Sequence, residues 1–413
     1  MLSRARPHTG ALFLFVASSV ANALAYGYQV LMARLLRPED YAVLTALFGI
    51  LILESISSQV IQSATAKLAA HYRARDEQDA LHAFVRRWAV RVGGGAAALG
   101  VIVALLSGPI AGALALPPVS VALLGLTLFL ALVFTFGLGL LQGLARFVWM
   151  GTALIAQAGA RLVVGVALVL AGFGVDGAFV GATAAIAVSL AFAAVPLAPL
   201  AGAARGAVVA HELGASETRF FALSGVVLLA YAALTNLDAV LARSLLAPDE
   251  AGAYAGAITM GKIVLFAPVA IGFLLLERTS RGHARGEDID RPLFAALAFV
   301  LATSGLVAVA YVVAPGVLVD IVVGSQYPRT ADVVPLYGFA ALSNALLSLW
   351  IAYFIGRGAM RVGILVALAV LVELALLLTG VSDAVSLARI VLAVTLATQA
   401  GAIATFVLLR ARR

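Results

Sequence analysis

The sequence predicts an all-α polytopic membrane protein, with about twelve transmembrane helices in two six-helix lobes. The first observation is composition: 63% of the 413 residues are apolar and 11% are charged, too little polar surface for a water-soluble fold of this length. The second is a series of apolar runs long enough to cross a hydrocarbon core of about 30 Å. The third is an internal repeat, because the stretch from Arg34 to Tyr41 returns about 210 residues later, from Arg243 to Tyr254.

The repeat divides the chain into two related halves. Such a repeat in an apolar chain is typical of transporters, in which two bundles move around a shared central site. We expect an N-terminal lobe over residues 1–200, a linker over 201–219 and a C-terminal lobe over 220–413. Six spans in each lobe give both lobes the same orientation, related by a pseudo-twofold axis along the membrane normal. The predicted spans lie near 10–36, 42–66, 88–108, 119–142, 152–172, 177–198, 220–246, 251–276, 292–314, 333–355, 362–380 and 387–409.

The distribution of positive charge predicts the orientation. Most of the 27 Lys and Arg residues fall on one side of the membrane if the N-terminus is inside, and short cytoplasmic loops retain positive charge. We therefore expect both termini in the cytoplasm, and we expect no nucleic-acid partner. A cleavable signal peptide is the competing interpretation, since Arg4 and Arg6 precede an apolar stretch and the Ala21 to Ala23 segment. Cleavage there would remove the helix that pairs with residues 220–246.

No pattern in the sequence indicates an enzyme. Gly172 to Gly177 matches the dinucleotide pattern G-x-G-x-x-G, but no strand precedes it, which favours a tight outer turn between two spans. Glu287 to Asp290 resembles the acidic pair of glycosyltransferases, but Pro292 and an apolar helix follow, which favours a capped helix N-terminus. The five His residues lack metal-ligand spacing, and the absence of Cys excludes thiolate chemistry.

Polar side chains follow one face of the two equivalent helix pairs of the repeat. In the first span, Ser18, Asn22, Tyr26 and Gln29 recur at helical spacing. Ionised groups inside a membrane cost about 2.5–3.5 kcal/mol each on insertion scales, so such stripes predict the walls of one aqueous cavity. The other three stripes comprise Glu54, Ser58, Gln62 and Thr65; Ser224, Tyr231, Thr235, Asn236 and Asp238; and Tyr254 and Lys262.

Further polar residues lie in three other spans, and together with the stripes they give the candidate site. Span 152–172 contains Gln157 and Arg161, span 333–355 contains Tyr337, Asn344 and Ser348, and span 362–380 contains Glu373. Cationic groups bind phosphate oxygens by charge-assisted hydrogen bonds, which suits an anionic passenger. Buried carboxylates can take up H⁺ or Na⁺. The candidate substrate-binding residues are Arg161, Arg243, Lys262, Arg34, Asn22, Tyr26, Tyr231 and Asn236, and the candidate ion-coupling residues are Glu54, Asp238 and Glu373.

Structural roles are the alternative for each of these residues. Arg161 could pair with Glu54 across two helices, as membrane bundles often allow. Arg34 and Arg243 lie near outer helix ends, where long basic side chains extend to the headgroups. Their matched positions in the two halves could reflect ancestry alone.

Three stretches also carry a family resemblance: RLLRPEDY ending at Tyr41, TNLD ending at Asp238 with LLAPDEAGAY ending at Tyr254, and GSQY ending at Tyr327. They resemble the oligosaccharide flippases (Wzx-like) of the multidrug/oligosaccharidyl-lipid/polysaccharide (MOP) exporter superfamily, over essentially the whole chain. The resemblance implies a MATE/MOP-like fold, alternating access, and movement of a polyprenyl-diphosphate-linked glycan between leaflets. Asp238 and Lys262 match the family's acidic and basic positions in helices seven and eight. The Pro that usually ends helix eight is absent.

We interpret the chain as a non-enzymatic flippase of a lipid-linked oligosaccharide or exopolysaccharide precursor in a bacterial inner membrane. Expected partners are the lipid-linked glycan, membrane lipids and polysaccharide-assembly proteins, and no cofactor is expected beyond a coupling H⁺ or Na⁺. A MATE-type drug or cation antiporter is the first alternative, which would favour acidic and aromatic walls. A membrane-embedded glycan polymerase or ligase would require a large outer loop with acid–base residues. A structural partner in a polysaccharide-synthesis complex would tolerate substitutions throughout the polar stripes.

Overall fold

The computed structural model describes residues 7–201, 214–265 and 288–411, together with positions 271, 275 and 279. Every element in these residues is helical, and ten of the helices are long and apolar enough to cross a membrane. Each predicted span except 251–276 falls on one of the ten, and 152–172 and 177–198 share the continuous segment Phe147–Leu200. The span predicted at 251–276 begins as a helix over Pro248–Val264, and most of its remainder lies outside the described residues. The polytopic all-α prediction is confirmed.

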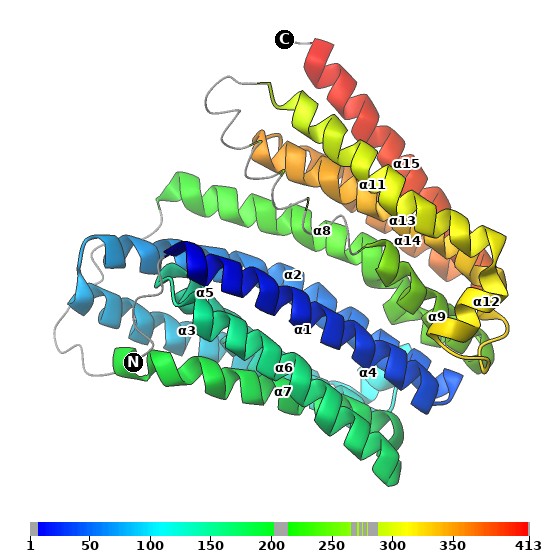
Figure 1. The fold of residues 1–413 in the computed structure, drawn as a ribbon, viewed down its shortest axis with the longest axis horizontal. Coiled ribbons are helices and arrows are strands. Elements are labelled where there is room, and N and C mark those ends of the chain that lie inside the picture. The colour runs from blue at the N-terminus through cyan, green and yellow to red at the C-terminus, as the bar shows by residue number, and fades with distance from the viewer. Residues whose placement is uncertain are drawn as a thin grey trace. The chain divides into compact units, whose positions relative to one another are not determined.

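The chain forms two compact units, one made of residues 1–36 and 54–222 and the other of residues 37–53 and 223–413. The first half of one long helix, α2, therefore groups with the C-terminal part of the chain. In the first unit, α6 packs against α1 and α7, and α5 packs against α3 and α7 (Figure 1). Its elements are α1 (Pro7–Leu35), α2 (Pro38–Ala74, shared), α3 (Gln78–Leu105), α4 (Ser107–Leu114), α5 (Pro118–Gly143), α6 (Phe147–Leu168), the π-helical η1 (Val169–Phe173), α7 (Gly174–Leu197) and the 3₁₀-helical η2 (Ala198–Ala201).

The second unit is organised around α13, which packs against α9, α11 and α15. More of this helix is buried than of any other candidate span. Near the C-terminal end of this helix, the aromatic side chains of Trp350, Tyr353 and Phe354 are buried together with Phe406 of α15. The elements are α8 (Ala215–Leu245), α9 (Pro248–Val264), α11 (Asp290–Val313), α12 (Pro315–Val322), α13 (Thr330–Gly356), α14 (Val362–Gly380) and α15 (Ala384–Ala411).

Glycine pairs allow helices of the first unit to cross at very short distance. A Cβ atom on Gly181 of α7 would lie 2.4 Å from the Cα atom of Gly165 on α6. The same holds where α3 meets α5, because a Cβ atom on Gly125 would lie 2.4 Å from the carbonyl oxygen of Gly100. Small residues at crossings are typical of membrane helices, which associate through close van der Waals packing rather than through a hydrophobic driving force.

The repeated Arg-to-Tyr stretch forms the same turn in both halves. Leu36 donates a backbone hydrogen bond to the Met32 carbonyl, and Leu246 donates the equivalent bond to the Ala242 carbonyl. Each following helix begins with Pro, at Pro38 or Pro248, with two acidic residues in its first turn. Proline fits the first helical position and acidic side chains favour the positive end of the helix dipole, so the sequence signature has a structural cause.

The glycine-rich match at Gly172 also serves a turn, as predicted. Gly172 and Gly174 have φ angles of 91° and 53°, a region that L side chains rarely adopt, where η1 meets α7. At the start of α11 the capping carboxylate is that of Asp288, which accepts from the backbone amide of Asp290 at 2.9 Å. The predicted helix N-terminus is confirmed there, with the cap two residues earlier than Asp290.

An ion-pair cluster and a helix cap hold together three helix N-termini of the second unit. Arg329, just before α13, pairs with Glu250 and Asp249 of α9, and Glu250 accepts the backbone amide of Ala384 at 3.0 Å. Asp383 caps α15 by accepting the backbone amide of Ser386 at 2.7 Å. That hydrogen bond lowers the pKa of Asp383, because it favours the charged carboxylate.

Candidate functional site

The second unit encloses a buried cluster of two carboxylates and two tyrosines. Asp238 of α8 and Glu373 of α14 are 1% and 0% exposed. The hydroxyl of Tyr254 on α9 donates to Asp238 Oδ2 at 2.6 Å, and Tyr337 of α13 also approaches this carboxylate. The rings of Tyr254 and Tyr337 meet edge to face, with centroids 5.4 Å apart. We call these four residues the carboxylate–tyrosine cluster.

Four different helices position the cluster, and a glycine makes room for it. Gly261 of α9 lies directly under the Tyr337 ring, where a Cβ atom would come within 2.4 Å of ring carbon Cε1. The Tyr254 and Asp238 side chains come from the helices that flank the repeated turn, α8 and α9. Glu373 lies midway along α14 and is one of the few buried residues on that helix. The site therefore depends on the packing of α8, α9, α13 and α14 within one unit.

The charge of the cluster is not balanced by any described side chain. Asp238 Oδ1 and both carboxylate oxygens of Glu373 are buried without a hydrogen-bond partner among the described residues. Neither residue forms an ion pair there, and the two carboxylates repel each other electrostatically. A buried, uncompensated carboxylate is very costly, and two together cost more. The arrangement therefore needs a proton or a cation, and its oxygen atoms are suitable ligands for a hard cation such as Na⁺.

No group of three or more His, Asp or Glu side chains that could hold a metal ion is found in the described part of the chain. The carboxylate–tyrosine cluster offers two carboxylates and two hydroxyls, oxygen groups that can take up H⁺ or bind Na⁺.

Glu54, the third predicted ion-coupling residue, lies in the first unit on α2. Its Oε1 atom is buried without a hydrogen-bond partner, while Ser58 lies one turn further along the same helix and interacts with the carboxylate. Glu54 makes no ion pair with any described residue, so the alternative in which it pairs with Arg161 is not found. Arg161 instead lies beside Tyr28, whose hydroxyl donates to the Ala178 carbonyl at 2.8 Å.

The predicted substrate-binding residues are divided between the two units. In the first unit Asn22 and Arg34 are exposed, while Tyr26 and Arg161 are half-buried. In the second unit Arg243 and Lys262 are half-buried, and two other candidates donate hydrogen bonds to backbone carbonyls. Tyr231 donates to the Asn344 carbonyl at 2.9 Å, and Asn236 donates to the Ala232 carbonyl at 3.0 Å. The predicted common cavity for all of these residues stays a prediction.

The sequence indicated the two acidic residues of the cluster but not their partners. Tyr254 lies on a predicted polar stripe and Tyr337 is among the polar residues of span 333–355, yet a tyrosine in such a position is too common to mark a site. The signal that could have found Tyr254 is its place in the repeat, where it follows an acidic turn in the same way as Tyr41. No local pattern indicates that α14 meets α8.

Comparisons with known proteins identify the fold. No protein-family profile matches the chain, and no characterised protein matches it by sequence. An inward-facing multidrug resistance MATE family transporter of the MOP superfamily has a similar structure, with a TM-score of 0.67 and 13% identity over 96% of this chain and 94% of that one. The chain has the fold of the MOP superfamily. Within this superfamily fold, the inward closed lipid II flippase MurJ also has a TM-score of 0.67, with 12% identity over 96% of this chain and 87% of MurJ.

A MATE transporter of Vibrio cholerae, in a single-substitution form, gives a TM-score of 0.64 with 18% identity over 98% of both chains. MOP-fold neighbours thus include both MATE transporters and a lipid flippase. All of them match along nearly the full length of the chain. The carboxylate–tyrosine cluster therefore lies in a multi-pass membrane fold.

Proposed function

We propose that the chain is a flippase that moves a polyprenyl-diphosphate-linked oligosaccharide, or a related exopolysaccharide precursor, across a bacterial inner membrane. In this proposal both termini are cytoplasmic, and the chain belongs to the Wzx-like branch of the MOP superfamily. Arg161, Arg243 and Lys262 bind the anionic head. Asp238 and Glu373 take up the cation that drives the cycle, and Glu54 contributes in the other unit.

One observation carries the proposal: three intramembrane carboxylates have no ion-pair partner among the described residues. Glu54, Asp238 and Glu373 form no ion pair with any described residue. Charges at membrane depth are costly, and structural pairing is the usual reason that they persist. For these three carboxylates, a bound cation or proton is the remaining explanation. Guanidinium and ammonium groups suit a diphosphate, and carboxylates suit a cation.

The cluster also supports a simple coupling step. Loading with H⁺ or Na⁺ neutralises one carboxylate and stabilises the packing of α8, α9, α13 and α14 around Asp238. Loss of the cation leaves two repelling carboxylates that favour separation of these helices. A cation that binds one conformation more tightly shifts the equilibrium by the difference in its binding free energies. Entry of the cation from one side therefore biases the direction of the cycle.

A MATE-type drug or cation exporter is the second candidate function, because two of the structural neighbours above are MATE transporters. Such an exporter would use Asp238 and Glu373 for a cationic passenger. The three basic residues in the spans would then face a substrate of like charge. This electrostatic conflict is the reason that the flippase ranks first.

Reconstitution in liposomes separates the two functions. A short polyprenyl-diphosphate glycan with a labelled sugar is placed in both leaflets, and a membrane-impermeant enzyme modifies the outer-leaflet sugar. The flippase makes nearly all of the sugar accessible within minutes, and the substitutions Arg243→Gln with Lys262→Gln abolish this while leaving the protein folded. If only half of the labelled glycan becomes accessible while a lipophilic cation is transported, the protein is an exporter and the proposed flippase function is wrong.

A further inference from the structure

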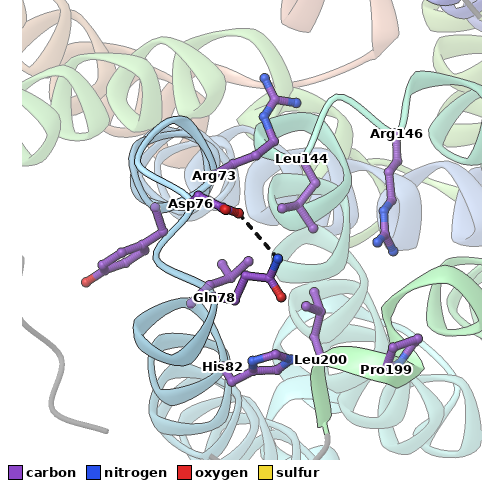
Figure 2. Close-up of a pocket in the computed structure, with 10 residues that line it drawn as sticks. Arg73, Asp76, Gln78, His82, Leu144, Arg146, Pro199 and Leu200 are labelled. Atoms are coloured by element: carbon purple, nitrogen blue, oxygen red, sulfur yellow. Dashed lines mark hydrogen bonds between the residues drawn. The ribbon is translucent and has the colours of Figure 1, made fainter. Parts of the chain in front are cut away.

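A second polar site lies at one end of the first unit, far along the helices from the intramembrane residues discussed above. It is a cavity of about 310 Å³ between the α2–α3 turn, the α5–α6 turn and the end of α7 (Figure 2). The charge distribution predicts that this end of the helices faces the cytoplasm. Its polar lining comprises Arg73, Asp76, Gln78, His82 and Arg146.

The turns that form the cavity are locally constrained. Asp76 has a φ angle of 55° in the α2–α3 turn, and its carboxylate accepts the Gln78 side-chain amide at 3.3 Å. On the opposite side, the Arg146 guanidinium donates to the carbonyl of Pro196 near the end of α7. Figure 2 shows Gln78 and His82 on one side and Arg146 on the other, with Leu144 and Leu200 between them. The cavity is thus shaped by backbone conformation and hydrogen bonds at three helix ends.

The lining of the cavity carries more positive than negative charge. It has two arginines, Arg73 and Arg146, and one carboxylate, Asp76, which accepts a hydrogen bond from the Gln78 side-chain amide. Neither arginine forms an ion pair among the described residues. Burial lowers the pKa of the Arg146 guanidinium, the effect expected for a cation held without a compensating charge. A bound anion would remove that penalty, and two guanidinium groups match the oxygen geometry of a phosphate.

The remaining walls are mostly apolar and the cavity lies where helices end. The lining is completed by Tyr72, Leu81, Leu144, Pro199 and Leu200, so a ligand with an apolar part is accommodated beside its charged group. The volume is at the low end of the range for small-molecule sites, which fits one headgroup and not a lipid-linked oligosaccharide. Basic pockets between spanning helices at the cytoplasmic surface are suited to anionic lipid headgroups.

We propose that this cavity binds the phosphate headgroup of an anionic phospholipid from the inner leaflet, with Arg73 and Arg146 as its ligands. The site is separate from the transport route and does not depend on which substrate the protein moves. The phosphate lies between the two guanidinium groups, His82 and Gln78 contact its remaining oxygens, and the glycerol region contacts Leu144 and Leu200.

Native mass spectrometry of the purified, delipidated full chain tests this site. Phosphatidylglycerol, phosphatidylcholine and glycerol 3-phosphate are titrated separately, and binding is compared among the wild type, Arg73→Gln, Arg146→Gln and Arg361→Gln. Arg361 is an exposed residue at the start of α14, so its variant removes an equal charge outside the cavity. Loss of one charged hydrogen-bond donor should weaken phosphatidylglycerol binding about tenfold in each of the first two variants and leave the Arg361→Gln variant unchanged.

The other outcomes each overturn the assignment. Equal binding of phosphatidylcholine would show that the lining does not select an anion. Binding of glycerol 3-phosphate as tightly as phosphatidylglycerol would make the ligand a soluble phosphate and not a lipid. An equal loss in all three variants would indicate general surface attraction. Arg146 also donates a hydrogen bond to the Pro196 carbonyl, so Arg146→Gln could lower the thermal stability of the protein. In that case the lipid binding of Arg73→Gln alone decides whether the proposed site is correct.

Discussion

Asp238 and Glu373 are fully buried carboxylates, and three of their four oxygens lack a hydrogen-bond partner among the described residues. Substitution by the neutral isosteres Asp238→Asn and Glu373→Gln should preserve the fold, since it removes a buried charge without changing volume. It should also remove any stabilisation by a bound cation. If Na⁺ is the coupling ion, raising it to about 100 times its Kd should stabilise the wild type by about 2.7 kcal/mol and neither variant. Thermal unfolding in NaCl and in choline chloride measures this difference.

Asp249→Asn is the matched control, because Asp249 is exposed and forms its ion pair with Arg329 at the helix N-terminus, outside the cluster. This variant should keep the full sodium-dependent shift. Retention of the same shift by Glu373→Gln would contradict the assignment of the cluster.

Among the residues of the site, Asp238 and Glu373 could be predicted from the sequence, because a carboxylate in an apolar span is unusual. Tyr254 and Tyr337 were not predictable as partners, because their role depends on which helices pack together.

At the scale of helices, the close crossing of α6 and α7 predicts different effects for two glycines. Gly181→Ala places a methyl group 2.4 Å from Gly165, so the helices must separate, at a cost of about 1–3 kcal/mol. Gly159→Ala on α6 meets no atom within 4 Å and should be neutral or slightly stabilising, since Ala favours the helix by about 1 kcal/mol. Thermal unfolding in detergent compares them. Equal effects of the two substitutions would show that the crossing does not limit stability.

The cap of α15 gives a second prediction at this scale. Asp383→Ala should destabilise the protein by about 0.5–2 kcal/mol at neutral pH, whereas Asp383→Asn should retain most of the stability. The pKa of Asp383 is lowered in the folded state, so its contribution is complete above the ordinary pKa of about 3.9 and is lost as the pH falls through the folded value. The stability difference between wild type and Asp383→Ala should therefore shrink in strong acid to the part that a neutral capping side chain supplies. A difference that does not shrink there would contradict this account.

For the whole molecule, hydrophobic runs and the repeat predicted the elements well because each span must satisfy its backbone hydrogen bonds within its own helix. The repeated turn at Pro38 and Pro248 was likewise readable, since proline and acidic residues act locally. The grouping of helices that are far apart in the sequence could not be predicted from the residues. The first half of α2 packs with the second unit, and nothing in the residues 37–53 distinguishes them from the rest of that helix. Helix partners depend on shape, as at Gly181 and Gly165, which hydropathy does not report.

The central claim is that a cation taken up at Asp238 and Glu373 drives the flipping of an anionic lipid-linked glycan. Its most direct test is the rate of glycan flipping in liposomes under an imposed Na⁺ or H⁺ gradient, with either ion tested alone. One of the two gradients should accelerate flipping at least tenfold in the wild type, and the double substitution Asp238→Asn with Glu373→Gln should make the rate independent of both. Gradient-dependent flipping that survives this double substitution, or wild-type flipping that responds to neither gradient, would contradict the account.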